Sequence, residues 1–341
     1  MEHKASIWKK LLTLKTAIIV LVPLCIASIC VTIFYYLPKT TPEELFSAIT
    51  NYNYNEITHY VLWEIKAPRI LGALIVGALL PIGGAVMQGI TRNYLASPGT
   101  VGVDSGAGLG LAIAMAITGG ATSYVGNVLW SMAGATCSTL IIFYVSSQIR
   151  GRESGVKLLL AGSAIGSLFS GLASSLNIWT GLGQNIYTWN NSGFLGVKWV
   201  GIGVLMVGVL GGIIGISIGD KITVLGMGDE TATSLGENVK KIKTLGVISV
   251  VLISGATVCT VGNIGFVGMI LPNMVKMAVG EDFKKVIPIS AFFGSMFLVI
   301  ADVISRWINM PAETPIGAVT SIIGIPIFLY LINSRKSKGG F

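Results

Sequence analysis

The sequence predicts an all-α membrane protein with about ten transmembrane helices and both termini in the cytoplasm. Composition is the first support: 52% of the 341 residues are hydrophobic and only 11% are charged, with a mean hydropathy of +0.77. Soluble domains carry roughly 25% charged residues. The second support is a series of long apolar segments, and the third is a one-sided distribution of Lys and Arg in the loops between them. The 44 glycines are typical of membrane helices that pack closely.

A membrane-spanning helix needs about 20 mostly apolar residues. On that basis the sequence holds ten candidate segments, at about 16–37, 70–90, 99–118, 122–147, 158–178, 199–218, 245–262, 265–279, 286–308 and 315–333. The first segment is too long for the apolar core of a signal peptide, so we interpret it as a span. No hydrophilic module interrupts the series. We therefore predict a single transmembrane domain over residues 1–341.

The positions of Lys and Arg predict the orientation. With the N-terminus in the cytoplasm, eighteen of the 23 Lys and Arg residues fall inside. The five outside are Lys39, Lys66, Arg69, Lys198 and Arg306. Cytoplasmic loops of membrane proteins carry such an excess, so the net charge of +8 is explained by topology. We expect lipid contact and no nucleic-acid partner.

Residues 219–244 form the only long polar stretch in the second half of the chain. The stretch is acidic first and basic last, and Gly226, Gly228 and Gly236 divide it into helix-sized pieces. The predicted orientation places it in the cytoplasm. We interpret it as the surface that a soluble partner binds.

Sequence motifs for catalysis and for cofactor binding are absent. There is no GxxxxGK[ST] phosphate loop, no HExxH and no paired metal-binding His/Cys spacing. The run from Gly106 to Gly110 lies inside an apolar segment, and we expect it to pack against another helix rather than to bind a dinucleotide. We therefore expect no catalytic residue, metal or cofactor on this chain.

Ionisable residues in or beside the apolar segments are few. Asp302 and Arg306 have i,i+4 spacing with the acid first, which predicts an intrahelical pair. Asp104 and Glu313 flank segments and could cap helix ends. The series of intramembrane acids that a proton-coupled carrier needs is missing.

Three stretches together resemble one family of membrane proteins. They are APRIL followed by GALIVGALLPIGGAVMQGITRNYLASPGTVGVDSGAG (67–108), LGMGDETATSLGENVKKIK (225–243), and GFVGMILPNMVKMAVGEDFKKVIPISAFFG followed after six residues by ADVISRWINMPAETPIGAVTSIIGIPIFLYL (265–331). In order and spacing they resemble the membrane subunit of a type II ABC importer, the FecCD-like family that carries iron–siderophore complexes, haem and cobalamin. That family has ten spans with both termini inside, which agrees with the segments above.

The resemblance implies a permease subunit that pairs with a second permease chain, either identical or homologous. Two separate ATPase chains would bind ATP and Mg²⁺ on the cytoplasmic side, and a solute-binding protein would deliver substrate from outside. The 219–244 loop would dock into the ATPases through coupling helices at about 230–235 and 237–243, broken at Gly236. A plain helix cap is the alternative role of this glycine. The implied coupling residues are Asp229, Glu230, Leu235, Gly236 and Asn238.

On the outer face, the resemblance implies Lys66, Arg69 and Arg306 as solvent-exposed cations that meet acidic residues of the binding protein. Interfacial snorkelling is the alternative for these side chains.

The resemblance also implies residues along the translocation pathway. Met87, Gln88 and Asn273 are placed there, and Ser154 and Gly155 are placed at the inner gate. Two positions depart from the family pattern: Tyr94 stands where Pro is common, and Asn273 stands where His is common.

From these features we expect an importer of an iron(III)–siderophore in a bacterial plasma membrane, with haem or cobalamin as alternative substrates of the same scaffold. A secondary carrier without an ATPase is the alternative from another class, and its energy source would distinguish it. A membrane enzyme would need a catalytic cluster that the sequence lacks. The chelate, the pairing of the permeases and the type of cell envelope are not readable from the residues.

Overall fold

The computed structural model describes residues 18–32, 42–53, 55–99, 102–121, 123–148, 154–310 and 312–336. Every regular element in these ranges is a helix, and none of them contains a strand. The all-α prediction is therefore confirmed. Both chain ends and Lys39 lie outside the described residues, so the cytoplasmic location of the termini stays a prediction.

Each of the ten predicted segments overlaps a helix. In chain order these are Ile18–Thr32, α4 (Ala67–Thr91), α5 (Val103–Thr118), α6 (Tyr124–Gln148), α7 (Ser154–Thr180), α9 (Trp199–Ser217), α12 (Val239–Val261), α13 (Val267–Val279), α14 (Phe283–Trp307) and α15 (Ile316–Lys336). The shorter elements are α2 (Pro42–Thr50), α3 (Ile57–Tyr60), the π-helical turn η1 (Val61–Lys66), α8 (Gly183–Asn190), α10 (Gly219–Gly226) and α11 (Asp229–Ser234).

Five helices in the described ranges are long and apolar enough to cross a membrane. They are Ile57–Thr91 (α3, η1 and α4 in continuation), Tyr124–Val145, Trp199–Ser217, Val239–Val261 and Phe283–Trp307. Four further apolar helices are shorter: Ile18–Thr32, Val103–Thr118, Val267–Val279 and Ile316–Tyr330. The number of spans, predicted as ten, stays a prediction.

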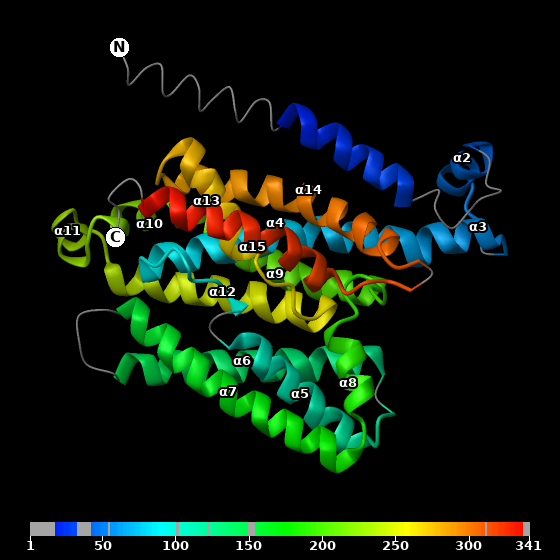
Figure 1. The fold of residues 1–341 in the computed structure, drawn as a ribbon, viewed down its shortest axis with the longest axis horizontal. Coiled ribbons are helices and arrows are strands. Elements are labelled where there is room, and N and C mark those ends of the chain that lie inside the picture. The colour runs from blue at the N-terminus through cyan, green and yellow to red at the C-terminus, as the bar shows by residue number, and fades with distance from the viewer. Residues whose placement is uncertain are drawn as a thin grey trace.

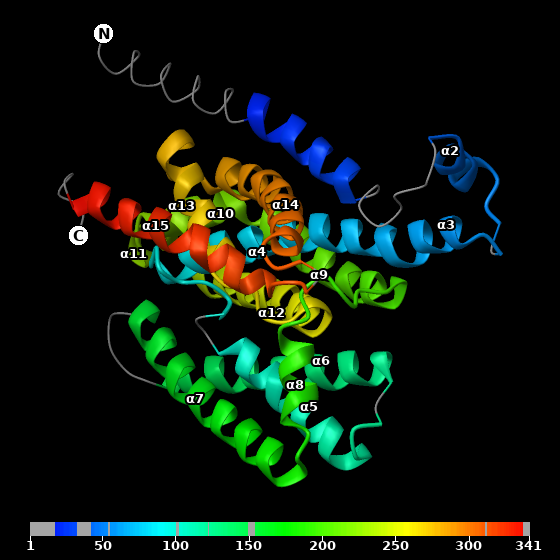
Figure 2. The same cartoon turned by 45° about the vertical axis from the view of Figure 1, so that its right-hand side comes forward.

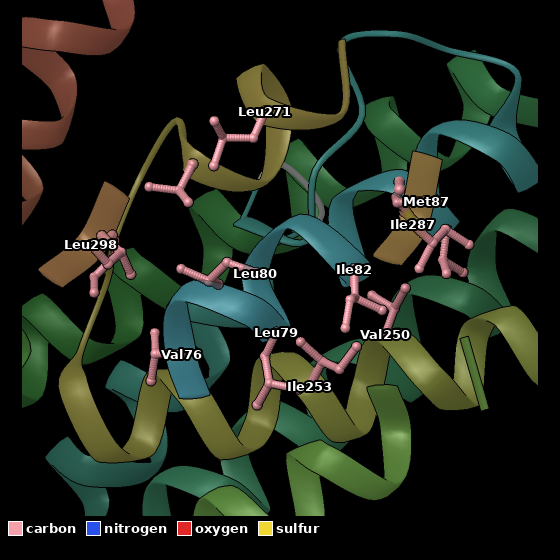
Figure 3. Packing of buried hydrophobic residues seen from close by; sticks show 14 of the residues in the cluster. Val76, Leu79, Leu80, Ile82, Met87, Val250, Ile253, Leu271, Ile287 and Leu298 are labelled. Atoms are coloured by element: carbon pink, nitrogen blue, oxygen red, sulfur yellow. The ribbon is translucent and has the colours of Figure 1, made fainter. Parts of the chain in front are cut away.

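Helix α4 lies in the middle of the larger group of helices and contacts α14, α12, α13 and α9 (Figures 1 and 2). Helices α5, α6 and α7 form a second group beside it, and α12 joins the two groups through contacts with α5 and α6. Figure 3 shows buried side chains of the core around α4: Val76, Leu79, Leu80, Ile82 and Met87 from α4, Val250 and Ile253 from α12, Leu271 from α13, and Ile287 and Leu298 from α14.

Glycines bring the helices of both groups into backbone contact. A Cβ on Gly134 of α6 would lie 2.2 Å from the carbonyl oxygen of Gly106, and one on Gly110 would lie 2.2 Å from the carbonyl oxygen of Trp130. The predicted packing role of the Gly106–Gly110 run is therefore confirmed. Small residues allow this close approach where apolar burial alone does not drive association in lipid.

The polar loop and the outer segments lie at opposite ends of the helix bundle (Figure 1). Helices α10 and α11 lie at one end, and the described end of α15 points toward the same end. Helices α2 and α3 lie at the other end.

Candidate functional sites

The polar loop folds as α10, α11 and the first turns of α12. The predicted helix at 230–235 is confirmed with a shift of one residue, because α11 covers Asp229–Ser234. The predicted second coupling helix at 237–243 is wrong as a separate element. Asn238 is the N-cap of α12, and the helix continues without a break from Val239 through the apolar segment.

Gly236 ends α11 with a left-handed residue, at φ +85°. Its N–H donates to the carbonyl of Thr233 at 3.0 Å, and the N–H of Glu237 donates to the carbonyl of Ala232 at 3.0 Å. These two bonds define a Schellman cap, which favours glycine because other residues are strained at this φ. Nothing lies within 4 Å of a Cβ built on Gly236, so the cap is open to a partner.

The Asn238 side chain begins α12. Its Oδ1 accepts a hydrogen bond from the backbone N–H of Lys241 at 3.0 Å, which satisfies one of the free donors of the first turn. The tip between the two helices is exposed: Glu230 faces solvent, and Leu235 has 63% of its surface exposed. Asn238 and Gly236 thus shape the loop, while Glu230 and Leu235 are available for contact.

Asp229 holds α11 to two other parts of the chain. Its Oδ2 accepts from Nζ of Lys243 at 2.7 Å, and its Oδ1 pairs with the guanidinium of Arg92. Arg92, at the end of α4, also donates through Nε to the carbonyl of Leu225 at 3.0 Å. Partial burial acts to raise the pKa of Asp229, but its hydrogen bond with Lys243 and the charges of Lys243 and Arg92 outweigh that effect and lower the pKa. Sequence reasoning predicted only a topological role for Arg92 and Lys243, as cations of the cytoplasmic side.

The three outer cations are buried, so their predicted exposure is wrong for this conformation. Lys66 and Arg306 are each 3% exposed, and Arg69 is 7% exposed. Nη2 of Arg69 lies 2.8 Å from Oδ1 of Asp302 and 2.8 Å from Oε2 of Glu313. Nη2 of Arg306 lies 3.0 Å from Oδ2 of Asp302, which confirms the predicted intrahelical pair.

The cause of this burial is the contact between α4 and α14. Asp302 and Arg306 occupy one face of α14, and that face packs on the outer end of α4, where Arg69 lies. Arg306 also donates to Oγ1 of Thr32 in the first described helix at 2.6 Å. Charged groups inside a protein are retained when they are paired and hydrogen-bonded in this way.

The residues assigned to the pathway lie inside the contact between α4 and α13. Met87 is 0% exposed, Gln88 is 2% exposed and Asn273 is 6% exposed. Nε2 of Gln88 and Nδ2 of Asn273 both donate to the carbonyl of Met269, at 3.0 and 2.8 Å. The structure thus brings Gln88 and Asn273 together, and their role in translocation stays a prediction.

A buried lysine belongs to the same cluster. Nζ of Lys276 donates to Oε1 of Gln88 at 2.7 Å and lies 5.1 and 4.6 Å from the ring centroids of Tyr94 and Phe283. Asn273 also donates to the carbonyl of Tyr94 at 2.8 Å, so the two positions that depart from the family pattern are in contact. The predicted orientation counts Lys276 only among the cytoplasmic cations; its place one turn after Asn273 in the predicted 265–279 segment was the available indication of this contact.

Ser154 and Gly155 begin α7. Their side-chain environment lies outside what the structure describes, so their assignment to the inner gate also stays a prediction.

Comparisons with known proteins give one consistent result. The family model described as the FecCD transport family matches residues 24–334. An iron(3+)-hydroxamate import permease of Bacillus subtilis is 39% identical over 87% of this chain and 77% of its own length. A cobalamin import permease of Halobacterium salinarum is 34% identical over 86% of this chain and 79% of its own length.

The fold has a counterpart among solved structures. A chain described as an inward-facing metal-chelate type ABC transporter superposes with a TM-score of 0.80 at 25% identity, over 94% of this chain and 99% of that chain.

Proposed function

This chain belongs to the FecCD transport family, and we propose that it imports an iron(III)–siderophore across the plasma membrane as the permease subunit of an ATP-driven importer. The observation that carries the proposal is the family match over residues 24–334 together with an exposed polar loop over residues 219–244. Permeases of this family are membrane transport components, and the chain is accordingly a multi-pass protein of the cell membrane. ATP and Mg²⁺ would bind to separate ATPase chains.

The choice of an iron–siderophore rests on the relatives. The iron(3+)-hydroxamate permease is more similar to this chain than the cobalamin permease is, at 39% against 34% identity. Haem and cobalamin remain the alternative substrates, because the same scaffold serves them. A second permease chain would complete the pathway, and a solute-binding protein would select the chelate.

The loop supplies a route for coupling. An ATPase that contacts Glu230, Leu235 and the Gly236 cap would move α11 as one rigid piece. The carboxylate of Asp229 joins α11 to Arg92 at the end of α4 and to Lys243 on α12. A preference of the ATPases for one position of α11 would therefore bias the arrangement of two helices of the core.

A solute-binding protein that docks on the outer face through these cations would have to replace one of their present carboxylate partners. Arg69, Arg306 and Lys66 are buried, and Arg69 and Arg306 are neutralised by Asp302 and Glu313. Of the two carboxylates, Glu313 is nearer to solvent, with 16% of its side chain exposed against 6% for Asp302. A carboxylate of the binding protein would replace Glu313 on Arg69 with the smallest disturbance of the core.

Co-purification of the tagged chain in mild detergent tests the proposal. An ATPase is expected to stay with the wild type and with Gly236→Asn, since Asn tolerates the left-handed cap. It is expected to be lost with Gly236→Trp, which fills the open space, and to be weakened by Leu235→Asp, which changes only an exposed side chain. A second permease chain in the sample would distinguish a heterodimer from a homodimer.

Uptake of an iron(III)–siderophore should also stop when the partner ATPase is inactivated. Uptake that persists, or that follows an ion gradient when the chain alone is placed in liposomes, would contradict the importer and favour a secondary carrier.

A further inference from the structure

Two non-helical segments meet near the middle of α4. One follows α4 and contains Pro98, and the other, residues 262–266, connects α12 to α13. A Cβ on Gly83 would lie 3.2 Å from Cγ of Pro98. A Cβ on Gly268, in the first turn of α13 just after the second segment, would lie 2.8 Å from the carbonyl oxygen of Leu80. Non-helical backbone at membrane depth occurs where protein buries it or where it lines a cavity.

A small cavity lies between these segments, with a volume of about 40 Å³. Asp104, in the first turn of α5, lines it together with Ser254 and Thr257 of α12 and residues 262–265. Oδ2 of Asp104 lies 3.0 Å from the position of a Cβ on Gly99. None of the salt bridges among the described residues includes Asp104.

The hydroxyl groups of the cavity offer oxygen acceptors. Ser254 is 1% exposed, and its Oγ has no hydrogen-bond partner among the residues that the structure describes. Thr257 is 1% exposed and donates its proton to the carbonyl of Ile253 at 2.9 Å, so its oxygen can still accept. A buried hydroxyl without a partner leaves an oxygen atom that a bound ion or a water molecule would satisfy.

The end of α12 adds a favourable field for a cation. The helix covers 23 residues and ends at Val261, beside the cavity. The last carbonyls of a helix lack partners within the helix and carry the negative end of its dipole. Three features therefore meet at this cavity: the Asp104 carboxylate, the Ser254 hydroxyl without a hydrogen-bond partner, and the C-terminal end of α12.

We propose that this cavity binds one monovalent cation of the size of Na⁺, with the Asp104 carboxylate as its only formal charge. Its lining includes the Asp104 carboxylate and the hydroxyl groups of Ser254 and Thr257, and oxygen atoms are the ligands that hard cations take. No group of three or more His, Cys, Asp or Glu residues that could hold a metal occurs in the described ranges, and one carboxylate balances one positive charge. The volume admits an ion or a water molecule, and it excludes a chelate.

The cation would neutralise a charge that is costly at membrane depth. It would also join α5, α12 and the 262–266 connection at the level where both non-helical segments meet. The inference concerns binding by this chain alone, so its test is separate from that of ATP-driven import.

Two measurements on the purified full chain in detergent test the site: binding of radioactive Na⁺, and thermal unfolding in NaCl against choline chloride at equal ionic strength. We expect saturable binding of one ion per chain and an unfolding midpoint that rises with Na⁺ but not with choline. Asp104→Asn should weaken Na⁺ binding at least about tenfold, and Ser254→Ala should weaken it less. Glu64→Gln, which changes an exposed acid in η1, is the matched control and should bind Na⁺ like the wild type.

Several results would overturn the site. Equal Na⁺ binding by wild type and Asp104→Asn would do so. A wild-type midpoint that responds to pH but not to Na⁺, with the pH response lost in Asp104→Asn, would mean that the cavity holds a proton instead. If Asp104→Asn elutes as an aggregate, Asp104→Glu, which keeps the charge but moves the oxygen atoms, and Ser254→Ala provide the same comparison.

Discussion

Arg69 and Asp302, 233 positions apart in the chain, form a buried contact through two nitrogen atoms. Nε of Arg69 lies 3.2 and 3.1 Å from the two carboxylate oxygens, and Nη2 donates to Oδ1 at 2.8 Å. The same carboxylate accepts from Arg306 at 3.0 Å. The Asp302 carboxylate thus contacts both guanidinium groups and joins α4 to α14.

Removal of Asp302 should therefore be strongly destabilising. Asp302→Ala leaves two buried guanidinium groups with one remaining carboxylate, and loss of one partner of a buried pair costs about 3–5 kcal/mol. Glu313→Gln should cost less, because its side chain is more exposed and Arg69 keeps Asp302. Chemical unfolding of the purified chain in detergent measures both changes. Equal losses of unfolding free energy for the two variants would mean that Asp302 contributes no more than Glu313 to this cluster of buried charges.

The contact of Asp229 with Arg92 and Lys243 predicts a pH-dependent contribution to stability. Its pKa is lowered from 3.8 in the folded chain, so the contribution is present above 3.8 and is lost as the pH falls through the lower folded value. The side chains are partly exposed, so the contribution should not exceed about 1 kcal/mol at neutral pH.

The measurement is the difference in unfolding midpoint between wild type and Asp229→Asn across a pH series. The difference should be constant at neutral pH and should vanish in acid. Asp220→Asn, an exposed acid on α10, should leave the midpoint at neutral pH unchanged. A difference that grows in acid would have the wrong sign for this ion-pair network.

The hydrogen bond from Asn273 to the carbonyl of Tyr94 predicts a local effect on the segment after α4. Asn273→Leu removes the bonds to Tyr94 and to Met269 and leaves their carbonyls with fewer partners, at a cost of about 1–3 kcal/mol. Hydrogen exchange should then speed up in residues 93–99 more than in α9. Met274→Leu, at an exposed neighbouring position on α13, is the control. Unchanged exchange in 93–99 would mean that other contacts hold this segment.

Local features of the sequence predicted the long helices and the polar loop between α9 and α12. The apolar segments predicted the long helices, and Gly236 predicted the end of α11. Both features are local, because they depend only on residues close together in the chain. Residues 237–243 were misassigned as a separate helix because their polarity resembles a loop, although Asn238 caps a helix that continues into the apolar segment.

The buried ion pairs could not be predicted from local features. Arg69 near a predicted helix end is compatible with exposure, and only the fold brings Asp302 and Glu313 to it. The same holds for Asp229, whose partner Arg92 lies 137 positions earlier in the chain. The i,i+4 pair of Asp302 and Arg306 was predictable, because a single helix determines that distance.

The approach of α4 and α13 at Gly84 gives the last prediction. A Cβ on Gly84 would lie 1.7 Å from the carbonyl oxygen of Gly268 and 2.5 Å from its carbonyl carbon, so Gly84→Ala must separate the two helices. Overpacking of this kind costs about 1–3 kcal/mol or more. Gly203→Ala on α9 is the matched control: nothing lies within 4 Å of its Cβ, and alanine in a helix interior should leave stability unchanged or raise it by up to about 1 kcal/mol. The free energy of unfolding in detergent should therefore fall for Gly84→Ala, and it should stay unchanged or rise for Gly203→Ala. Similar stability of Gly84→Ala and wild type would mean that the two backbones do not touch in the folded chain.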